Sequence, residues 1–498
     1  MSDIKKLASQ TAVYGIPTIV GRFLNYFLVP LYTYNIATQD YGVVSELYAY
    51  VSFLMIILTY GMETAFFRFS QDNDKRITYN TALLSLIGTT TVFIIVTFIF
   101  LRPIAHLLQY DNHHDYIALF LLIISLDALR AIPYALLRRE NKAKRFALVK
   151  SIDIFSNIFF NLFFIALCPI LYKNGNGFVT PWFRANDLVF YIFLSNLFAS
   201  TISFIMLMPQ YRQFQTKFDF KLLKKMLAYG FPVMIGGLAG MVNETFDRIA
   251  LRRLASVPSY ITDPNQAAAY KLSQIGIYGA CYKLSIVISL FIQAFKFAAE
   301  PFFFSKMKKD DAKQSYSSIM TAFVLFLCLI FLIVTSYIDL FQYFMGAKYR
   351  EGLIVVPILL MANIFLGIYY NLSIWYKITD KTEWGAYISL MGAGLTLLGN
   401  YLLVPVISYV GAAVTTLVCY IFIAVMCYLV GQKYYMVNYN LKRIFTYIIF
   451  AVILFAVNYF VQQNTSSMIL HISFATLTTA IYIVVAYKMD IHRMIKER

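Results

Sequence analysis

The stretch KMLAYGFPVMIGGLAGMVNETFDRIALRRL, residues 225–254, decides how the rest of the chain is interpreted. After its first residue it carries no charge as far as Asn243, and Glu244, Asp247 and Arg248 then follow within one turn of an expected helix. A helix needs about 20 apolar residues to cross a bilayer. An ionisable residue near the centre of such a helix costs about 2.5–3.5 kcal/mol on insertion scales. The stretch therefore predicts a membrane helix whose buried charges have a function.

The composition of the whole chain agrees with this interpretation. Of its 498 residues 60% are hydrophobic and only 13% are charged, which is about half the charged fraction of a soluble domain. A net charge of +17 would suggest nucleic acid in a soluble protein, but here loop topology explains most of it. We predict a polytopic membrane protein whose partner is the lipid bilayer, with no role for nucleic acid.

The sequence lacks the usual signatures of an enzyme. The five cysteines occur singly and the five histidines have no ligand spacing, so we expect neither disulfides nor a metal site. A GxxxxGK[ST] motif is absent, and no outer loop is long enough for the carboxylates and histidines of a membrane glycosyltransferase. We therefore expect a protein that is not an enzyme and has no cofactor.

Apolar length predicts an all-α fold with about fourteen transmembrane helices. The first six are expected near 10–35, 42–67, 79–101, 116–137, 146–171 and 188–208. The next six are expected near 226–254, 274–303, 316–338, 351–376, 386–404 and 411–431, and a final pair near 444–461 and 469–487.

A weak internal repeat organises these helices. YGFP at 229–232 repeats YGIP at 14–17, although Gly, Pro and aromatic residues are common enough in membrane helices to recur by chance. Because six is an even number, a second set of six enters the membrane in the same sense, which makes the repeat parallel. The predicted domains are an N-terminal six-helix lobe at 1–208, a cytoplasmic linker at 209–225, a C-terminal six-helix lobe at 226–431, and a helix pair with a cytoplasmic tail at 432–498.

Loop charge predicts the orientation. One alternating set of loops, together with both termini, holds roughly 28 Lys and Arg against about 6 in the other set, so the first set is expected to be cytoplasmic. Both termini then lie inside the cell. The basic stretch from Arg212 to Lys225 is either an amphipathic segment along the inner headgroups or a plain loop.

Cations deep in the predicted helices are the candidate substrate-binding residues. Arg22 lies in the middle of the first helix with Asn25 on the same face, Arg248 lies in the seventh, and Lys283 and Lys296 lie in the eighth. If these helices face one cleft, that cleft is basic. Phosphate is the anion that arginine binds best, through paired hydrogen bonds.

Acidic residues near these cations are candidate ion-coupling sites, namely Glu244, Asp247 and Glu300. The alternative is simple pairing, since Glu244 and Arg248, and likewise Lys296 and Glu300, have helical i, i+4 spacing. The adjacent Asp247 and Arg248 are expected to point in different directions.

Other polar residues are interpreted as structural. We expect Glu46, Asp153 and the pair Arg252–Arg253 to lie near helix ends and extend to the interface, and Asp127 to pair with Arg130. Hydrogen bonding between helices is the expected role of Asn363, Asn371 and Asn400.

The layout of six, six and two helices resembles the multidrug/oligosaccharidyl-lipid/polysaccharide (MOP) exporter superfamily, and specifically its Wzx-type O-antigen flippases of polysaccharide biosynthesis. The local matches are Gly21-Arg22, Asp40-Tyr41-Gly42, Asp247-Arg248, and GNYLLVP at 399–405 with Gly411-Ala412-Ala413.

The resemblance implies two lobes around a cationic cavity that alternate between inward-open and outward-open states. It implies a flippase that moves an undecaprenyl-pyrophosphate-linked oligosaccharide from the cytoplasmic to the outer leaflet of the bacterial inner membrane, driven by a Na⁺ or H⁺ gradient. Arg22 and Arg248 would contact the pyrophosphate, and Lys283 and Lys296 would extend the basic wall. Glycan polymerase and glycosyltransferases are the implied protein partners.

Three alternatives are weighed against this interpretation. A lipid II flippase would carry more basic residues in its first two helices, and a cation-coupled multidrug extruder would have an acidic, aromatic pocket. A membrane glycan polymerase or ligase would have a large catalytic outer loop. The basic character of the deep charges favours the first interpretation.

Overall fold

The computed structural model describes residues 20–21, 23–212, 217–307 and 309–491, and within these ranges the secondary structure is helical throughout, without strands. The predicted all-α fold is confirmed. Twelve helices in the described residues are long and apolar enough to cross a membrane. Helix α18 (Glu383–Tyr434) holds two of the predicted spans, and most of the first predicted span lies outside the described residues, which accounts for about fourteen spans.

The chain forms two compact units, residues 1–253 with 257–276, and residues 254–256 with 277–498. Unit 1 holds α2 (Leu28–Asn35), α3 (Thr38–Thr59), α4 (Met62–Asp72), α5 (Lys75–Ile99), α6 (Leu101–Leu107), α7 (His114–Arg139), α8 (Ala143–Asn161), the π-helix η1 (Leu162–Leu167), α9 (Cys168–Lys173), α10 (Leu188–Met206), α11 (Met208–Tyr211) and nearly all of α12 (Phe220–Leu254).

Unit 2 holds α14 (Ala312–Ser336), α15 (Ile338–Phe341), η2 (Gln342–Phe344), η3 (Ala347–Ile354), α16 (Val355–Leu372), α17 (Ile374–Ile378), α18, α19 (Leu441–Asn464), α20 (Met468–Ala486) and η4 (Tyr487–Ile491). Helix α13 (Pro264–Lys306) starts in unit 1 and continues in unit 2. Nearly all of helix α12, which the sequence analysis assigns to the C-terminal lobe, thus belongs to unit 1. The predicted lobe boundaries stay a prediction.

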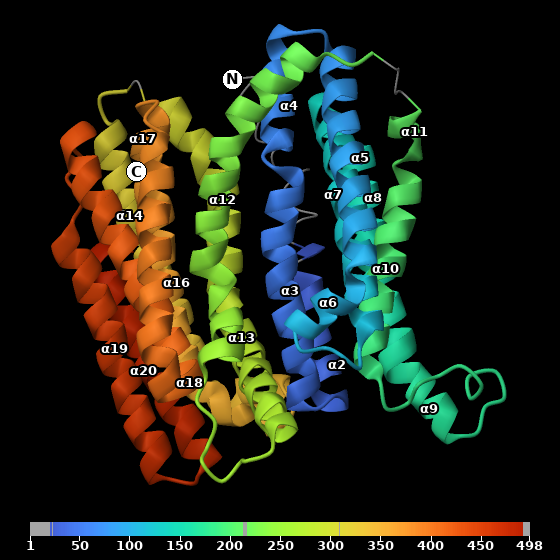
Figure 1. Cartoon of the computed structure of the whole chain (residues 1–498). Helices are drawn as coiled ribbons and strands as arrows, with labels where there is room; N and C mark the ends of the chain where they lie inside the picture. The colour runs from blue at the N-terminus through green and yellow to red at the C-terminus, as the bar shows by residue number, and fades with distance from the viewer. Residues whose placement is uncertain (1–19, 22, 213–216, 308, 492–498) are drawn as a thin grey trace. The chain divides into compact units, whose positions relative to one another are not determined.

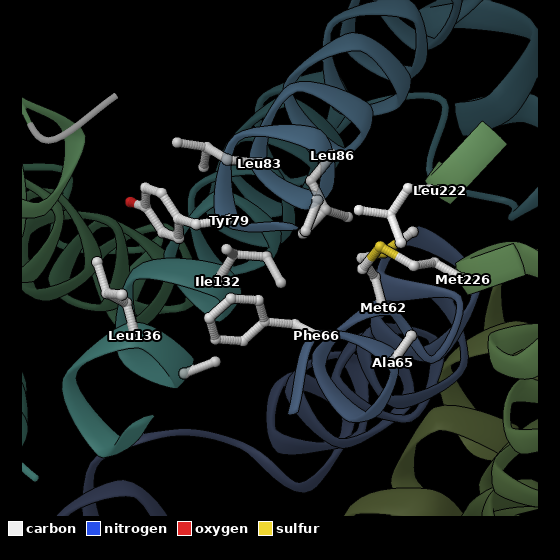
Figure 2. Packing of buried hydrophobic residues seen from close by; sticks show 12 residues of the cluster. Met62, Ala65, Phe66, Tyr79, Leu83, Leu86, Ile132, Leu136, Leu222 and Met226 are labelled. Atoms are coloured by element: carbon white, nitrogen blue, oxygen red, sulfur yellow. The ribbon is translucent and has the colours of Figure 1, made fainter. Parts of the chain in front are cut away.

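Helix α12 begins earlier than its apolar sequence predicts, at Phe220 rather than near 226. Asp219 caps its first turn, where its carboxylate accepts hydrogen bonds from the backbone N–H groups of Lys221 and Leu222. Leu222 and Met226 pack into a buried cluster contributed by α4, α5 and α7 (Figure 2). Lysines cover the opposite side of these turns. The second half of the predicted linker is therefore an amphipathic helix.

Helix α18 departs from straight geometry near its middle. A straight helix of its 52 residues would be about 78 Å long, more than twice the roughly 30 Å hydrocarbon core. Helical backbone angles are interrupted at Ile407 and Ser408, where Ser408 has a φ of 48°. Two residues earlier, Pro405 lacks the backbone N–H that a continuous helix would use. This interruption divides the predicted spans 386–404 and 411–431.

In unit 2, buried amides join helices to one another. Asn363 on α16 donates to the Ser285 carbonyl oxygen of α13 at 3.2 Å, and Ser289 donates to Asn363 at 2.9 Å. Asn458 on α19 donates to Ser336 on α14 and to Thr478 on α20, each at 2.7 Å. The final helix pair is therefore fixed to α14 by an amide, which is the interhelical role expected of buried Asn in a membrane.

At one end of unit 1, α3 crosses the start of α13 at very close range. A Cβ added to Gly42 would lie 1.9 Å from the Leu272 carbonyl oxygen, and a Cβ added to Gly276 would lie 1.9 Å from the Thr38 carbonyl oxygen. The hydroxyls of Thr38 and Ser273 share a hydrogen bond of 2.6 Å beside this crossing. Only glycine fits at both positions, because backbone atoms cannot move aside as flexible side chains can.

We expect Gly42→Ala to destabilise the protein by about 1–3 kcal/mol, because the new methyl group forces the two helices apart. The measurement is thermal unfolding of the full-length protein in detergent. Gly88→Ala in α5 is the matched control, since a Cβ there meets no atom within 4 Å. An equal melting temperature for the two variants would contradict the close crossing.

Candidate functional site

The seventh predicted helix, α12, carries a buried ion pair. Asp247 and Arg248 are 3% and 9% exposed, and the guanidinium Nη1 of Arg248 lies 2.6 Å from Asp247 Oδ1. The same nitrogen donates to the backbone carbonyl oxygen of Glu244 at 2.8 Å. The expectation that Asp247 and Arg248 point apart is wrong, because the flexible arginine folds back to its neighbour's carboxylate. Glu244 is exposed.

The first predicted helix is only partly described. Arg22 lies outside the described residues, and Asn25 is exposed on a short helical stretch before α2. The contribution of Arg22 to substrate binding therefore stays a prediction.

The eighth predicted helix, α13, carries the remaining candidate cations in unit 2. Lys283 and Lys296 are both half-buried, and the Lys296 ammonium lies 4.0 Å from the centre of the Tyr370 ring of α16. The side chain of Glu300 lies outside the described residues. Because Arg248 belongs to unit 1 and the lysines to unit 2, their convergence on one cleft stays a prediction.

These contacts are suited to holding cations in fixed positions inside a membrane. A carboxylate partner lowers the cost of burying the Arg248 guanidinium, which has five donors in a rigid fork. Contact with an aromatic face stabilises the Lys296 ammonium without using a hydrogen-bond acceptor. Arg248 with Asp247, and Lys296 with Tyr370, can each hold a positive charge in place to bind an anionic group.

A second buried network joins α7, α8 and α10 within unit 1. Arg130 pairs with Asp127 one turn away, as predicted, and also with Asp153 at 2.9 Å. Its Nη2 donates to the Ser200 hydroxyl at 3.2 Å, and Lys150 lies 4.0 Å from Asp153. The expectation that Asp153 extends to the interface is wrong, because Arg130 holds it inside the helix bundle. We assign this charge-balanced network a structural role.

Arg130→Met should destabilise the protein by about 3–5 kcal/mol, because it leaves two buried carboxylates without their shared counter-ion. Arg68→Ala is the matched control, since its ion pair with Asp72 is more than half exposed and should contribute about 1 kcal/mol or less. Thermal unfolding of both variants decides the point. Equal losses of stability would show that the network is not structural.

A third group of buried charges was not found from the sequence. Glu46 on α3 is fully buried, accepts a hydrogen bond from the Tyr110 hydroxyl at 2.7 Å, and lies 3.5 Å from Nε of Arg252. Arg252 is also buried and donates to the Ala268 carbonyl oxygen of α13 at 3.0 Å. The expectation that Glu46 and Arg252 extend to the interface is therefore wrong. The signal available in the sequence was the Arg252–Arg253 pair, which directly precedes a loop of the set that is poor in Lys and Arg.

Among the described residues, no group of three or more His, Cys, Asp or Glu is placed to hold a metal ion.

Comparison with known proteins gives a family and a fold. A model of the family described as "Polysaccharide biosynthesis protein" matches residues 7–308, which is more than half of the chain. Comparison with curated proteins found no match. A solved structure of the lipid II flippase MurJ in an inward closed conformation has a TM-score of 0.72 at 14% identity, covering 95% of this chain and 98% of that chain.

Two multidrug transporter structures are also similar. An inward-facing multidrug resistance MATE family transporter of the MOP superfamily has a TM-score of 0.54 at 12% identity, covering 87% of this chain and 94% of that one. The Vibrio cholerae MATE transporter VcmN in its bent form has a TM-score of 0.55 at 12% identity, covering 87% and 98%. At these identities the likeness shows a shared fold.

Proposed function

Because the chain belongs to the polysaccharide biosynthesis protein family and is a multi-pass membrane protein, we propose that it is a flippase of the MOP superfamily for a lipid-linked oligosaccharide. The proposed substrate is an undecaprenyl-pyrophosphate-linked glycan, such as an O-antigen unit of lipopolysaccharide. Transport runs from the cytoplasmic to the outer leaflet of a bacterial inner membrane.

The observation that carries this proposal is the buried Arg248 in a helix apolar enough to cross the membrane. An arginine inside a membrane helix has a free-energy cost, and residues of this kind commonly mark functional sites. Asp247 holds Arg248 in place, and the donors of its guanidinium group match the oxygens of a diphosphate. Lys296, held over Tyr370, adds a second cation on another spanning helix. A multidrug extruder for cationic drugs would need deep charges of the opposite sign.

The remaining roles follow from chemistry. Arg22 with Asn25 would bind the same diphosphate from the first helix, and Lys283 would extend the basic wall on α13. Glu244, Asp247 and Glu300 are the proposed coupling sites for Na⁺ or H⁺, and Asp247 would also orient Arg248.

The mechanism we propose is alternating access of two lobes around this diphosphate site. Neutralising the diphosphate with cations lowers the free energy of its passage through the apolar core, while the lipid tail stays in the bilayer. The basic loops, which include those after α4 and α7, face the cytoplasm together with both termini. Glycosyltransferases would supply the substrate, and a glycan polymerase would use the product outside.

A lipid II flippase is the second candidate, because the similarity to the MurJ structure extends over nearly the whole chain. Its substrate carries the same diphosphate on the same class of lipid, so the basic residues would act alike. Transport of each labelled substrate by the same preparation separates the two candidates.

We expect Arg22→Ala and Arg248→Ala to reduce flipping of a fluorescent polyprenyl-diphosphate glycan in proteoliposomes by at least about tenfold, since hydrogen bonds to charged groups contribute roughly 1.5–3 kcal/mol each. Arg248→Lys should retain more transport than Arg248→Ala, because it keeps the positive charge.

Arg443→Ala is the control for this assay, because it removes a basic residue at the start of α19 outside the proposed site. All variants are compared at equal amounts of folded protein. Wild-type transport by both Arg22→Ala and Arg248→Ala would show that the arginines are structural and would remove the support for an anionic substrate.

A further inference from the structure

We propose that Arg252, Arg253 and Lys271 form a second anion site, at the outer end of unit 1, and that it binds the diphosphate of the carrier lipid as it leaves the protein. Glu46 is the counter-ion that occupies this site in the present structure. The identity of the ligand rests on the proposed function, whereas the anion site itself rests on the contacts of these residues.

The site lies at the end of unit 1 that holds α6, α9 and the start of α13 (Figure 1). By loop charge this is the outer end, since the loops here belong to the set with about 6 Lys and Arg against roughly 28 in the other. Three cations gathered at this end therefore depart from the general pattern of the chain. Topology does not account for them.

Arg252 provides the buried part of the site. Its side chain is 2% exposed, its Nη1 donates to the Ala268 carbonyl oxygen, and its Nε lies 3.5 Å from the Glu46 carboxylate. A basic residue in the last turn of a helix commonly serves that helix by contacting its own last carbonyl groups. Arg252 instead contacts α3 and α13, so stabilisation of the end of α12 does not explain its position.

Arg253 and Lys271 provide the accessible part. Arg253 is exposed, and its Nη2 donates to the Leu107 carbonyl oxygen at 2.8 Å. Lys271 on α13 lies beside it, with its ammonium 3.5 Å from the backbone carbonyl oxygen of Arg253. Both contacts are to backbone carbonyls, which position the two cations without neutralising their charge.

The charges at this site do not balance. Arg252, Arg253 and Lys271 lie close together, whereas the carboxylate at this site is that of Glu46, which lies against Arg252 and accepts hydrogen bonds from the hydroxyl groups of Tyr110 and Tyr50. A diphosphate carries more negative charge than a carboxylate and offers oxygens in the geometry that guanidinium groups bind in pairs. It can therefore replace Glu46 as the counter-ion, and the exposed Arg253 is where it would first make contact.

The test uses the full-length protein in detergent and inorganic pyrophosphate as the probe, with binding measured by isothermal titration calorimetry. Glu46→Gln should strengthen pyrophosphate binding by about tenfold, because it removes the competing carboxylate while keeping its shape. The double variant Arg253→Gln/Lys271→Gln should weaken binding by at least about tenfold. Lys173→Gln, at an exposed lysine of α9, is the control and should bind as wild type does.

The site is overturned if Glu46→Gln and the double variant bind pyrophosphate as the wild type does, or if none of the proteins binds it. The proposed function has a separate readout in flipping of the polyprenyl-diphosphate glycan, which the double variant should slow by about tenfold. Unchanged flipping in the double variant, with Arg248→Ala inactive, overturns the exit role alone. Pyrophosphate binding that responds as expected, with flipping insensitive to every variant, leaves the anion site standing and overturns the proposed function.

Discussion

The cost of placing a charge inside a membrane is the constraint on which the structure depends. Each buried charge that the structure describes in unit 1 meets that cost with a partner: Arg130 with Asp127 and Asp153, Arg248 with Asp247, and Arg252 with Glu46. The three groups differ in their balance. The Arg130 network is neutral, whereas the group at Arg252 gathers more cations than carboxylates.

The Arg130 network joins three helices through two cations, two carboxylates and a hydroxyl, which suits a structural role. A cation in excess of its partners creates a positive potential in a medium of low dielectric, where an anion is strongly stabilised. We propose that this excess charge binds the diphosphate of the substrate, while glycine at the crossing of α3 and α13 lets the two backbones approach closely.

Apolar length in the sequence predicts the spans well, because each span must be long enough to cross the bilayer whatever surrounds it. Helix ends are predicted less well, as with the start of α12, because packing of Leu222 on α4, α5 and α7 extends the helix beyond its apolar stretch. Spacing along one helix predicts the pair of Asp127 with Arg130 but cannot show Asp153, which lies on another helix. For the same reason Glu46 and Arg252, far apart in sequence, could only be paired by the fold.

The most direct test of the account compares two substrates for the wild-type protein in proteoliposomes. The same labelled glycan is attached to a polyprenyl carrier through a diphosphate or through a monophosphate, and the rate of flipping is measured for each. The account predicts that the diphosphate-linked glycan is flipped at least about tenfold faster, since it forms more charge-assisted hydrogen bonds with the buried cations. Equal rates for the two substrates would contradict the claim that these cations recognise the diphosphate.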